Sequence, residues 1–207
     1  MKGYLQCSDS GIFYEVTGSG PALVFAHGLG GNYLSWWQQI PYFSQQYTCI
    51  TFSHRGFWPN AVVQEIPAIS VFADDLSALI DHLQLESVSL VAQSFGGWTC
   101  LEYALHHQSR VRALVMASTT GTLNYEAIKN IDIERMEEWK EWADREKTNL
   151  RARSIIPGAG SRMAEEQPSL YYLFRQIHEL SPAPFKDAMR MAIHRSRTLP
   201  SEIFSGL

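Results

Sequence analysis

Short apolar runs that alternate with helical patterns are the feature that most limits what this chain can fold into. The runs at residues 22–26, 88–92 and 111–117 suit a strand in length and are too short for a helix. Between them, residues 71–83 carry apolar side chains at spacings of three and four, which predicts an amphipathic helix. Strands that are apolar on both faces and separated by helices indicate a mostly parallel sheet flanked by helices, an α/β fold.

The other elements of the first half follow from turn residues and periodicity. We expect a β-hairpin of strands 4–7 and 12–16, a helix over 33–43, a strand over 47–52, a loop over 57–70 and a helix over 98–107. On the helix at 71–83, the side predicted to face water carries Asp74, Asp75 and Asp81.

The pattern changes near residue 121, after the run 118–121. Beyond it we expect helices and turns but no buried strand: helices over 133–150, 165–180 and 184–197, with a break at 157–160. We therefore predict a core in residues 1–121 and a helical region in residues 122–207.

Composition narrows the class of protein. The chain has 207 residues, 45% of them hydrophobic and 18% charged, and a net charge of −4, which indicates a folded globular protein. Without a basic block we expect no nucleic-acid partner, and without an apolar run near ~18 residues no membrane partner. Cys7, Cys49 and Cys100 lack metal-ligand spacing. We expect reduced cysteines, no metal, no cofactor, and, with no apolar leader, a cytoplasmic protein.

A serine on a sharp strand-to-helix turn is the strongest sign of chemistry. Ser94 follows the buried run 88–92 and precedes a helix, with Ala92 and Gly96 two residues to either side. Small residues there let the backbone close tightly and project the hydroxyl above the sheet. The pattern is A-x-S-x-G where G-x-S-x-G is usual, so a Ser-Gly loop without a catalytic role is the alternative.

A glycine-rich turn ends the neighbouring run 22–26. It reads His27-Gly28-Leu29-Gly30-Gly31. Such a turn can direct the N–H of Leu29, together with that of Phe95, toward the oxyanion formed when Ser94 attacks a carbonyl. A plain glycine turn is the alternative. A phosphate loop is a weaker one, because neither G-x-G-x-x-G nor G-x-x-x-x-G-K-[ST] is present.

In this order and at this distance, residues 10–121 resemble the α/β-hydrolase superfamily, and in particular its esterase and lactonase members related to 3-oxoadipate enol-lactonase. Residues 22–31 are similar to the oxyanion segment, 53–57 to the D-x-R-G-x turn, and 91–98 to the nucleophile elbow. The resemblance implies that residues 122–207 form a helical cap. Two departures are Ser53 in place of the usual Asp and Trp58-Pro59 in place of a usual Gly and its neighbour.

The resemblance also implies a catalytic acid and then a histidine after Ser94, and neither stands at its expected place. His106 and His107 end the helix that starts near Ser94, while His178 and His194 lie in helical patterns. Residues 117–120, one usual place for the acid, contain no carboxylate. The expectation that follows is a truncated copy of a hydrolase.

Three hypotheses remain from the sequence. The first is a serine hydrolase of the carboxylesterase or lactonase type, complete or truncated, that acts on a small-molecule ester or lactone. Aromatic residues of the cap would build its core or line its pocket, namely Trp139, Trp142, Tyr171, Tyr172 and Phe174. The second is a hydrolase-like binding or scaffold protein without a triad. The third is an enzyme in which His178 or His194 folds back from the cap.

The strand at 111–117 would be an uncovered apolar edge if no further strand follows it. We therefore expect this chain alone to be marginally stable or to cover that edge by forming a homodimer. Size-exclusion chromatography and thermal unfolding test this expectation. A monomer that unfolds cooperatively at high temperature would contradict it.

Overall fold

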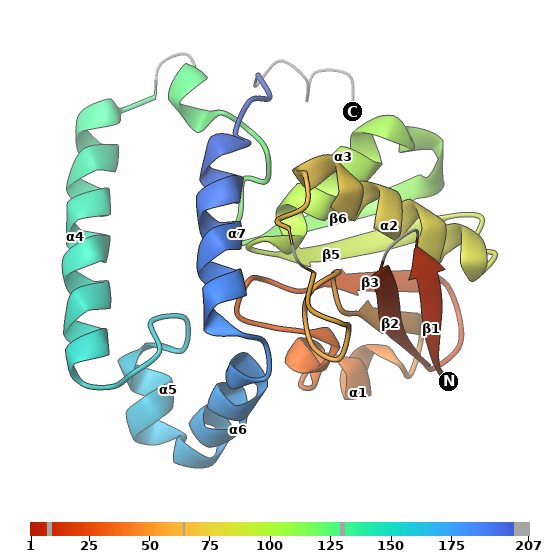
Figure 1. The fold of residues 1–207 in the computed structure, drawn as a ribbon, viewed down its shortest axis with the longest axis horizontal. Coiled ribbons are helices and arrows are strands. Elements are labelled where there is room, and N and C mark those ends of the chain that lie inside the picture. The colour runs from red at the N-terminus through yellow and green to blue at the C-terminus, as the bar shows by residue number, and fades with distance from the viewer. Residues whose placement is uncertain (8–9, 64, 129–130, 201–207) are drawn as a thin grey trace.

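A computed structural model describes residues 1–7, 10–63, 65–128 and 131–200. Six strands form one sheet in the order β1-β2-β4-β3-β5-β6 (Figure 1). They are β1 (Lys2–Cys7), β2 (Ser10–Thr17), β3 (Ala22–Ala26), β4 (Thr48–Phe52), β5 (Val88–Gln93) and β6 (Val111–Ala117). β2 pairs antiparallel with both β1 and β4, and the pairs β4-β3, β3-β5 and β5-β6 are parallel. The predicted α/β fold with a mostly parallel sheet is confirmed.

Helices cover both faces of the sheet because β3 is apolar on both. Val24 and Ala26 pack with α2 (Ile69–His82) and α3 (Gly96–His106) in the largest hydrophobic cluster. On the other face, the Phe25 ring contacts the ring of Trp36, with centroids 5.1 Å apart. Trp36 belongs to a short 3-10 helix, η1 (Tyr33–Trp36), which α1 (Ile40–Phe43) follows. Successive side chains of β3 point to opposite faces of the sheet, so this one strand contacts a helical layer on each face.

Two predicted helices are shorter than expected, and a proline explains each. The helix expected over 33–43 is divided into η1 and α1, with Pro41 in the first turn of α1, where the missing N–H costs nothing. The helix expected over 165–180 is divided into α5 (Gly160–Glu166) and α6 (Pro168–Glu179), and Pro168 begins the second. The first turn of a helix tolerates proline, whereas a proline in the interior interrupts the helix.

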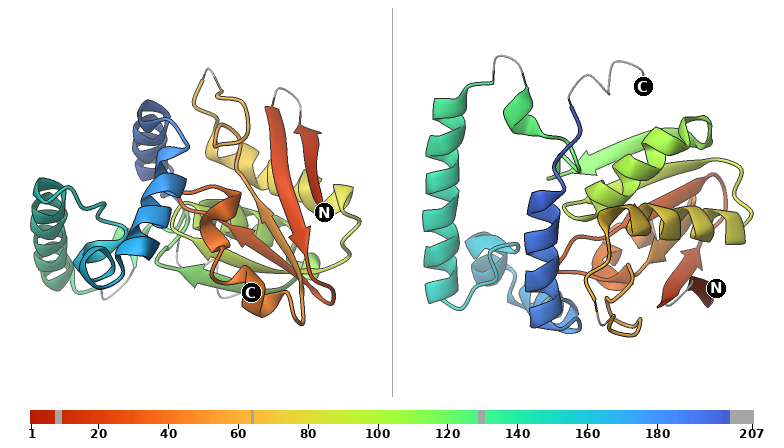
Figure 2. Two further views of the ribbon diagram at one scale, coloured as in Figure 1. Left: turned by 90° about the horizontal axis from the view of Figure 1, so that it is seen from below. Right: turned by 45° about the horizontal axis from the view of Figure 1, so that its top comes forward.

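The helical region after β6 leaves the body of the protein and returns to it. It comprises η3 (Tyr125–Ala127), α4 (Ile133–Ala152), α5, α6 and α7 (Ala183–Arg195), and α7 lies between α4 and the sheet (Figures 1 and 2). Its two ends meet at a parallel bridge between Leu123 and Leu199. The Asn124 N–H donates to the Leu199 carbonyl at 2.8 Å, and the Leu199 N–H donates to the Thr122 carbonyl at 3.1 Å.

Three aromatic side chains of this region are exposed, although the sequence suggested that they build the core of the cap or line its pocket. Trp139 and Trp142 on α4 are 62% and 55% exposed, and Tyr172 on α6 is 60% exposed. They neither build a core nor line a pocket, because α4 stands away from the sheet and buries little of its surface. Tyr171 is half-buried, and its hydroxyl bonds to the backbone of Ile156 and Ser154.

Opposite the edge strand β1, the sheet ends at β6. Within the described residues it pairs only with β5, and Val115 on it is 52% exposed. The three cysteines are free thiols, two of them buried. No helix in the described ranges is both long and apolar enough to cross a membrane.

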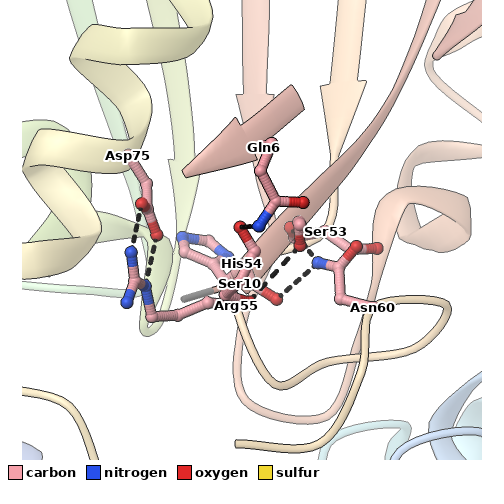
Figure 3. A network of polar contacts seen from close by, with 8 residues as sticks. Gln6, Ser10, Ser53, His54, Arg55, Asn60 and Asp75 are labelled. Atoms are coloured by element: carbon pink, nitrogen blue, oxygen red, sulfur yellow. Dashed lines mark hydrogen bonds and ion pairs between the residues drawn. The ribbon is translucent and has the colours of Figure 1, made fainter. Parts of the chain in front are cut away.

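A buried ion pair joins the end of β4 to α2. The Arg55 guanidinium donates to Asp75 through Nε at 2.7 Å and Nη2 at 2.6 Å (Figure 3). The two side chains are only 6% and 4% exposed. The prediction that Asp75 faces water is therefore wrong, although Asp74 and Asp81 are exposed as expected. Helical periodicity assigns polar residues to the exposed face of a helix, and it does not show that an arginine distant in sequence pairs with one of the acids.

We expect Asp75→Asn to lower the free energy of unfolding by about 3–5 kcal/mol, because it removes the carboxylate that balances a buried guanidinium. Its exposed neighbour supplies a matched control, since Asp74→Asn should change the value by less than about 0.5 kcal/mol. Urea unfolding of both variants at neutral pH measures the difference. Equal effects of the two substitutions would contradict the importance of the pair.

Candidate active site

Ser94 lies on the turn between β5 and α3, as the sequence suggested, and its backbone there is strained. Ser94 adopts φ of +49°, a left-handed conformation that is rare for residues other than glycine. The Ser94 N–H donates to the Ala117 carbonyl of β6 at 3.1 Å, and the Ser94 carbonyl accepts from the Gly97 N–H at 2.9 Å. These bonds stabilise the strained residue from both sides. Its side chain is half-buried at the carboxyl end of the sheet.

Two glycines let the neighbouring backbone approach this turn. A Cβ on Gly96 would lie 2.3 Å from the Ala26 carbonyl oxygen, at the end of β3. A Cβ on Gly28 would lie 2.2 Å from Oε1 of Gln93 and 3.1 Å from the Cβ of Ser94. A side chain at Gly96 would force the backbone to move, whereas at Gly28 the nearest obstacle is the end of the exposed Gln93 side chain. The glycine-rich turn after β3 therefore lies directly against Ser94.

The two expected oxyanion donors lie within this arrangement. Leu29 packs against the hydrophobic cluster that contains Phe95, and both residues follow strands that are paired in parallel at Ala26 and Ala92. Within the part of the chain that the structure describes, neither the Leu29 N–H nor the Phe95 N–H donates a hydrogen bond. The described contacts thus leave both N–H groups without an acceptor.

Behind the turn, two histidines form a buried hydrogen-bonded chain. His27 Nδ1 lies 2.8 Å from the Gly28 carbonyl oxygen, which can only accept, so Nδ1 carries the proton. His27 Nε2 therefore accepts from the His54 N–H and from His54 Nδ1, each at 3.0 Å. His54 Nε2 then accepts from the Thr99 hydroxyl at 2.9 Å. Every ring nitrogen is satisfied, and the chain holds the carbonyl of Gly28 in place.

Burial keeps both imidazoles neutral. It lowers the pKa of His27 to about 4. It also lowers the pKa of His54 well below the ordinary value, with a further contribution from a charge on His27. Because their nitrogens are occupied and their rings are 1% exposed, neither histidine is placed to take a proton from Ser94.

The loop that carries the two departures from the D-x-R-G-x pattern is also held by polar contacts. The Ser53 hydroxyl accepts from the Tyr33 N–H at 3.0 Å and donates to the Trp58 carbonyl at 2.8 Å. The Asn60 amide donates to the carbonyls of Ser53 and His54 (Figure 3). Ser53 therefore links the start of η1 at Tyr33 to the loop at Trp58, because a serine hydroxyl can both accept and donate a hydrogen bond.

Of the downstream histidines, the structure brings His178 to this site. A Cβ on Gly30 would lie 2.7 Å from Cδ2 and 3.1 Å from Nε2 of His178, so the ring sits against the glycine-rich turn. His106 is exposed at the far end of α3. The side chain of His194 lies outside the described residues. The third hypothesis named His178 as one of two histidines that could fold back from the cap, but its helical pattern alone could not choose between them, because the contact depends on the path of α6.

The structure assembles no triad from the residues it describes. Within those ranges, no Asp or Glu side chain bonds to a ring nitrogen of His178, and Ser94 makes no hydrogen bond to a histidine. Glu126, the first acid after β6, forms an exposed ion pair with Lys140 at 3.6 Å. No group of three or more His, Cys, Asp or Glu side chains in the described ranges could hold a metal ion.

We expect the buried histidines to make the stability pH-dependent. An unfolded histidine binds a proton below pH ~6.5. Folded His27 stays neutral to about pH 4, and the pKa of folded His54 is also well below its ordinary value, so the unfolded state binds more protons below pH ~6.5. Near pH 5 the free energy of unfolding should fall by about 2–3 kcal/mol per pH unit as the pH decreases. Urea unfolding between pH 4.5 and 7 measures this slope. His54→Gln removes one of the two titrating groups and should reduce the slope by about 1.4 kcal/mol per pH unit. The exposed control His106→Gln should leave the slope unchanged. Equal slopes in the parent and in His54→Gln would contradict the assignment.

Comparison with known proteins agrees with this geometry. The family model described as alpha/beta hydrolase fold matches residues 21–163. The chain is 32% identical over 125 residues to 3-oxoadipate enol-lactonase 2 of Acinetobacter baylyi, covering 59% of this chain and 47% of the relative. It is 33% identical over 123 residues to non-heme chloroperoxidase CPO-A1 of Kitasatospora aureofaciens, covering 58% and 45%. The chain thus matches about half the length of these curated relatives.

A solved structure shows the same fold. The enol-lactonase from Burkholderia xenovorans LB400 superposes with a TM-score of 0.71 at 18% identity, over 94% of this chain and 74% of that one. The strand order, the strained turn at Ser94 and the matched family model agree on the family of this chain. The chain belongs to the α/β-hydrolase fold family.

Proposed function

We propose that this chain carries the nucleophile and oxyanion donors of a serine hydrolase of the carboxylesterase or lactonase type, acting on a small ester or lactone. The observation that carries the proposal is the backbone of Ser94, held at φ of +49° directly against the glycine-rich turn. Strain of this kind is retained where the surrounding structure enforces it, and it concentrates at functional sites.

The chemistry follows from the positions. The Ser94 oxygen attacks the carbonyl carbon of the substrate, and the negative charge that develops on the carbonyl oxygen is stabilised by the N–H groups of Leu29 and Phe95. Collapse of this intermediate expels the alcohol and leaves an acyl group on Ser94, which water then removes. In a lactone the expelled oxygen remains tethered to the acyl chain.

Ser94 needs a base and an orienting acid for this reaction. His27 and His54 are excluded by their occupied nitrogens. In our proposal residues 1–121 form the core and residues 122–207 the cap, and the base and acid come from outside the described residues. The names of similar proteins, an enol-lactonase from Acinetobacter and an esterase from Exiguobacterium antarcticum, support the ester and lactone class. We further propose a cytoplasmic location.

One observation favours a second candidate, a binding protein without catalysis. In the described ranges His178 is bonded to Lys186 and to no acid, so its imidazole is not oriented as a triad base. A ligand would then be held by the same N–H donors without covalent reaction.

A fluorophosphonate probe separates the two candidates, because it reacts with an activated serine. We expect the parent to be labelled and Ser94→Ala to lose the label, with hydrolysis of p-nitrophenyl acetate falling at least about 10³-fold. Ser118→Ala is the matched control, since Ser118 follows the adjacent strand and also has a positive φ, of +52°. It should keep both activities.

Mass spectrometry of the labelled peptide and initial rates provide the readouts. An unlabelled, folded parent would overturn the catalytic proposal for this chain and leave the binding protein. A label that persists in Ser94→Ala would overturn the assignment of Ser94.

A further inference from the structure

Helix α4 carries two exposed tryptophans on one face. Trp139 and Trp142 are three residues apart, a spacing that makes them neighbours on the surface of a helix. They are 62% and 55% exposed, on a helix that stands away from the sheet (Figure 2). Adjacent apolar side chains that remain in water are typical of a surface that binds a partner.

The contacts of α4 with the rest of the described chain use a different side of the helix. Its buried residues are Ala143 and Leu150. At about 100° of rotation per residue, these two lie about 80–100° around the helix axis from Trp142. The neighbouring segments therefore cover one side of α4, and within the described ranges they leave the tryptophans in the solvent.

Four charged side chains share this face with the tryptophans. Positions three, four and seven apart lie along one stripe of a helix, so the stripe through Trp142 includes positions 135, 138, 139, 145 and 146. All of them are exposed except Glu146, which is half-buried. We call this stripe the tryptophan face; in chain order it consists of Arg135, Glu138, Trp139, Trp142, Arg145 and Glu146.

The charges of the tryptophan face alternate in sign: a cation and an anion precede the tryptophans, and a cation and an anion follow them. The helix dipole does not account for this order, because it disfavours a cation such as Arg135 in the first turn. Arg145 has an intrahelical partner, Glu141 at 3.7 Å, and both side chains are largely exposed. An exposed pair of this kind contributes little to stability and rearranges readily.

The same order makes the tryptophan face complementary to itself when two copies run antiparallel. With Trp139 opposite the partner's Trp142, the midpoint of the register lies halfway between the tryptophans, and Arg135 stands opposite the partner's Glu146. Glu138 and the partner's Arg145 are then offset by only about 3 Å along the axis, at 1.5 Å per residue. Twofold symmetry repeats each contact. A parallel pair in register would instead place each charge beside its own copy.

We propose that the tryptophan face is the dimer interface of this protein, where α4 of a second copy docks in the antiparallel direction. The tryptophans supply the buried apolar contacts, and the alternating charges fix direction and register. An interface of this type is isologous, so it closes on two copies. Because two helices of this length bury a small area, we expect a dissociation constant of about 1–100 µM. The inference does not depend on the proposed function.

Sedimentation velocity of the full chain over this range of concentration measures the association. We expect the mass to rise toward that of two chains, and Trp142→Ala to weaken the dimer at least about 30-fold, because the dimer loses the ring twice. The matched control is Tyr172→Ala on α6, which removes a ring that is 60% exposed outside this face and should change nothing. Circular dichroism checks the fold of each variant, and Trp139→Ala replaces Trp142→Ala if the latter does not fold.

Exchange of charges tests the antiparallel direction. Glu138→Arg alone and Arg145→Glu alone each bring like charges together in their own dimer, and each should associate at least about fivefold more weakly than the parent. A mixture of the two variants restores both opposite-charge contacts, so we expect the mixed dimer to bind within about threefold of the parent. Positions 138 and 145 are seven residues apart in one chain, beyond the reach of an intrahelical pair, so the rescue requires a second copy.

Three results would overturn the inference: a monomer throughout this range of concentration, a dimer that keeps its affinity in Trp142→Ala, or a mixture that associates no better than its two components. Val115→Lys on β6 tests the alternative interface at the sheet edge. A dimer that this substitution abolishes and that Trp142→Ala leaves intact would assign the contact to β6 and not to α4.

Discussion

The close approach of two parallel strand ends determines the rest of this structure. Where β3 and β5 end, the backbones are so near that Gly96 has no space for a side chain, and Gly28 lies against the side chains of Gln93 and Ser94. Ser94 adopts a left-handed conformation between them, and bonds to Ala117 and Gly97 hold it there. A backbone conformation that a free chain avoids is thus imposed by packing. The fixed position of the serine is the property that nucleophilic catalysis requires.

Polar groups beneath this junction are buried but satisfied. His27, His54 and Thr99 form a chain in which each donor meets one acceptor, and Arg55 pairs with Asp75. Such networks are costly when one member is lost, because the remaining groups cannot reach water. They therefore make the glycine-rich turn rigid, and they link the loops after β3 and β4 to helices α2 and α3.

The sequence predicted the elements that depend on local pattern. The strands at 88–92 and 111–117 and the turn at Ser94 appear where apolar runs and small residues indicated them. Contacts between distant segments were not predictable in this way. Asp75 has the spacing of an exposed residue, and His178 that of an ordinary helix residue. Only the fold shows that Arg55 meets the first and Gly30 the second. The exposure of Trp139 likewise depends on where α4 stands, which its own periodicity does not encode.

The bridge between Leu123 and Leu199 has a topological consequence. Because the helical region begins and ends at one point, the chain between these residues is a closed excursion from the core. Helix α4, which stands away from the sheet, can lengthen or shorten without altering the register of any strand. A fold built in this way can vary the surface above a fixed nucleophile through insertions alone, so changes in ligand selectivity need not disturb the folding of the core.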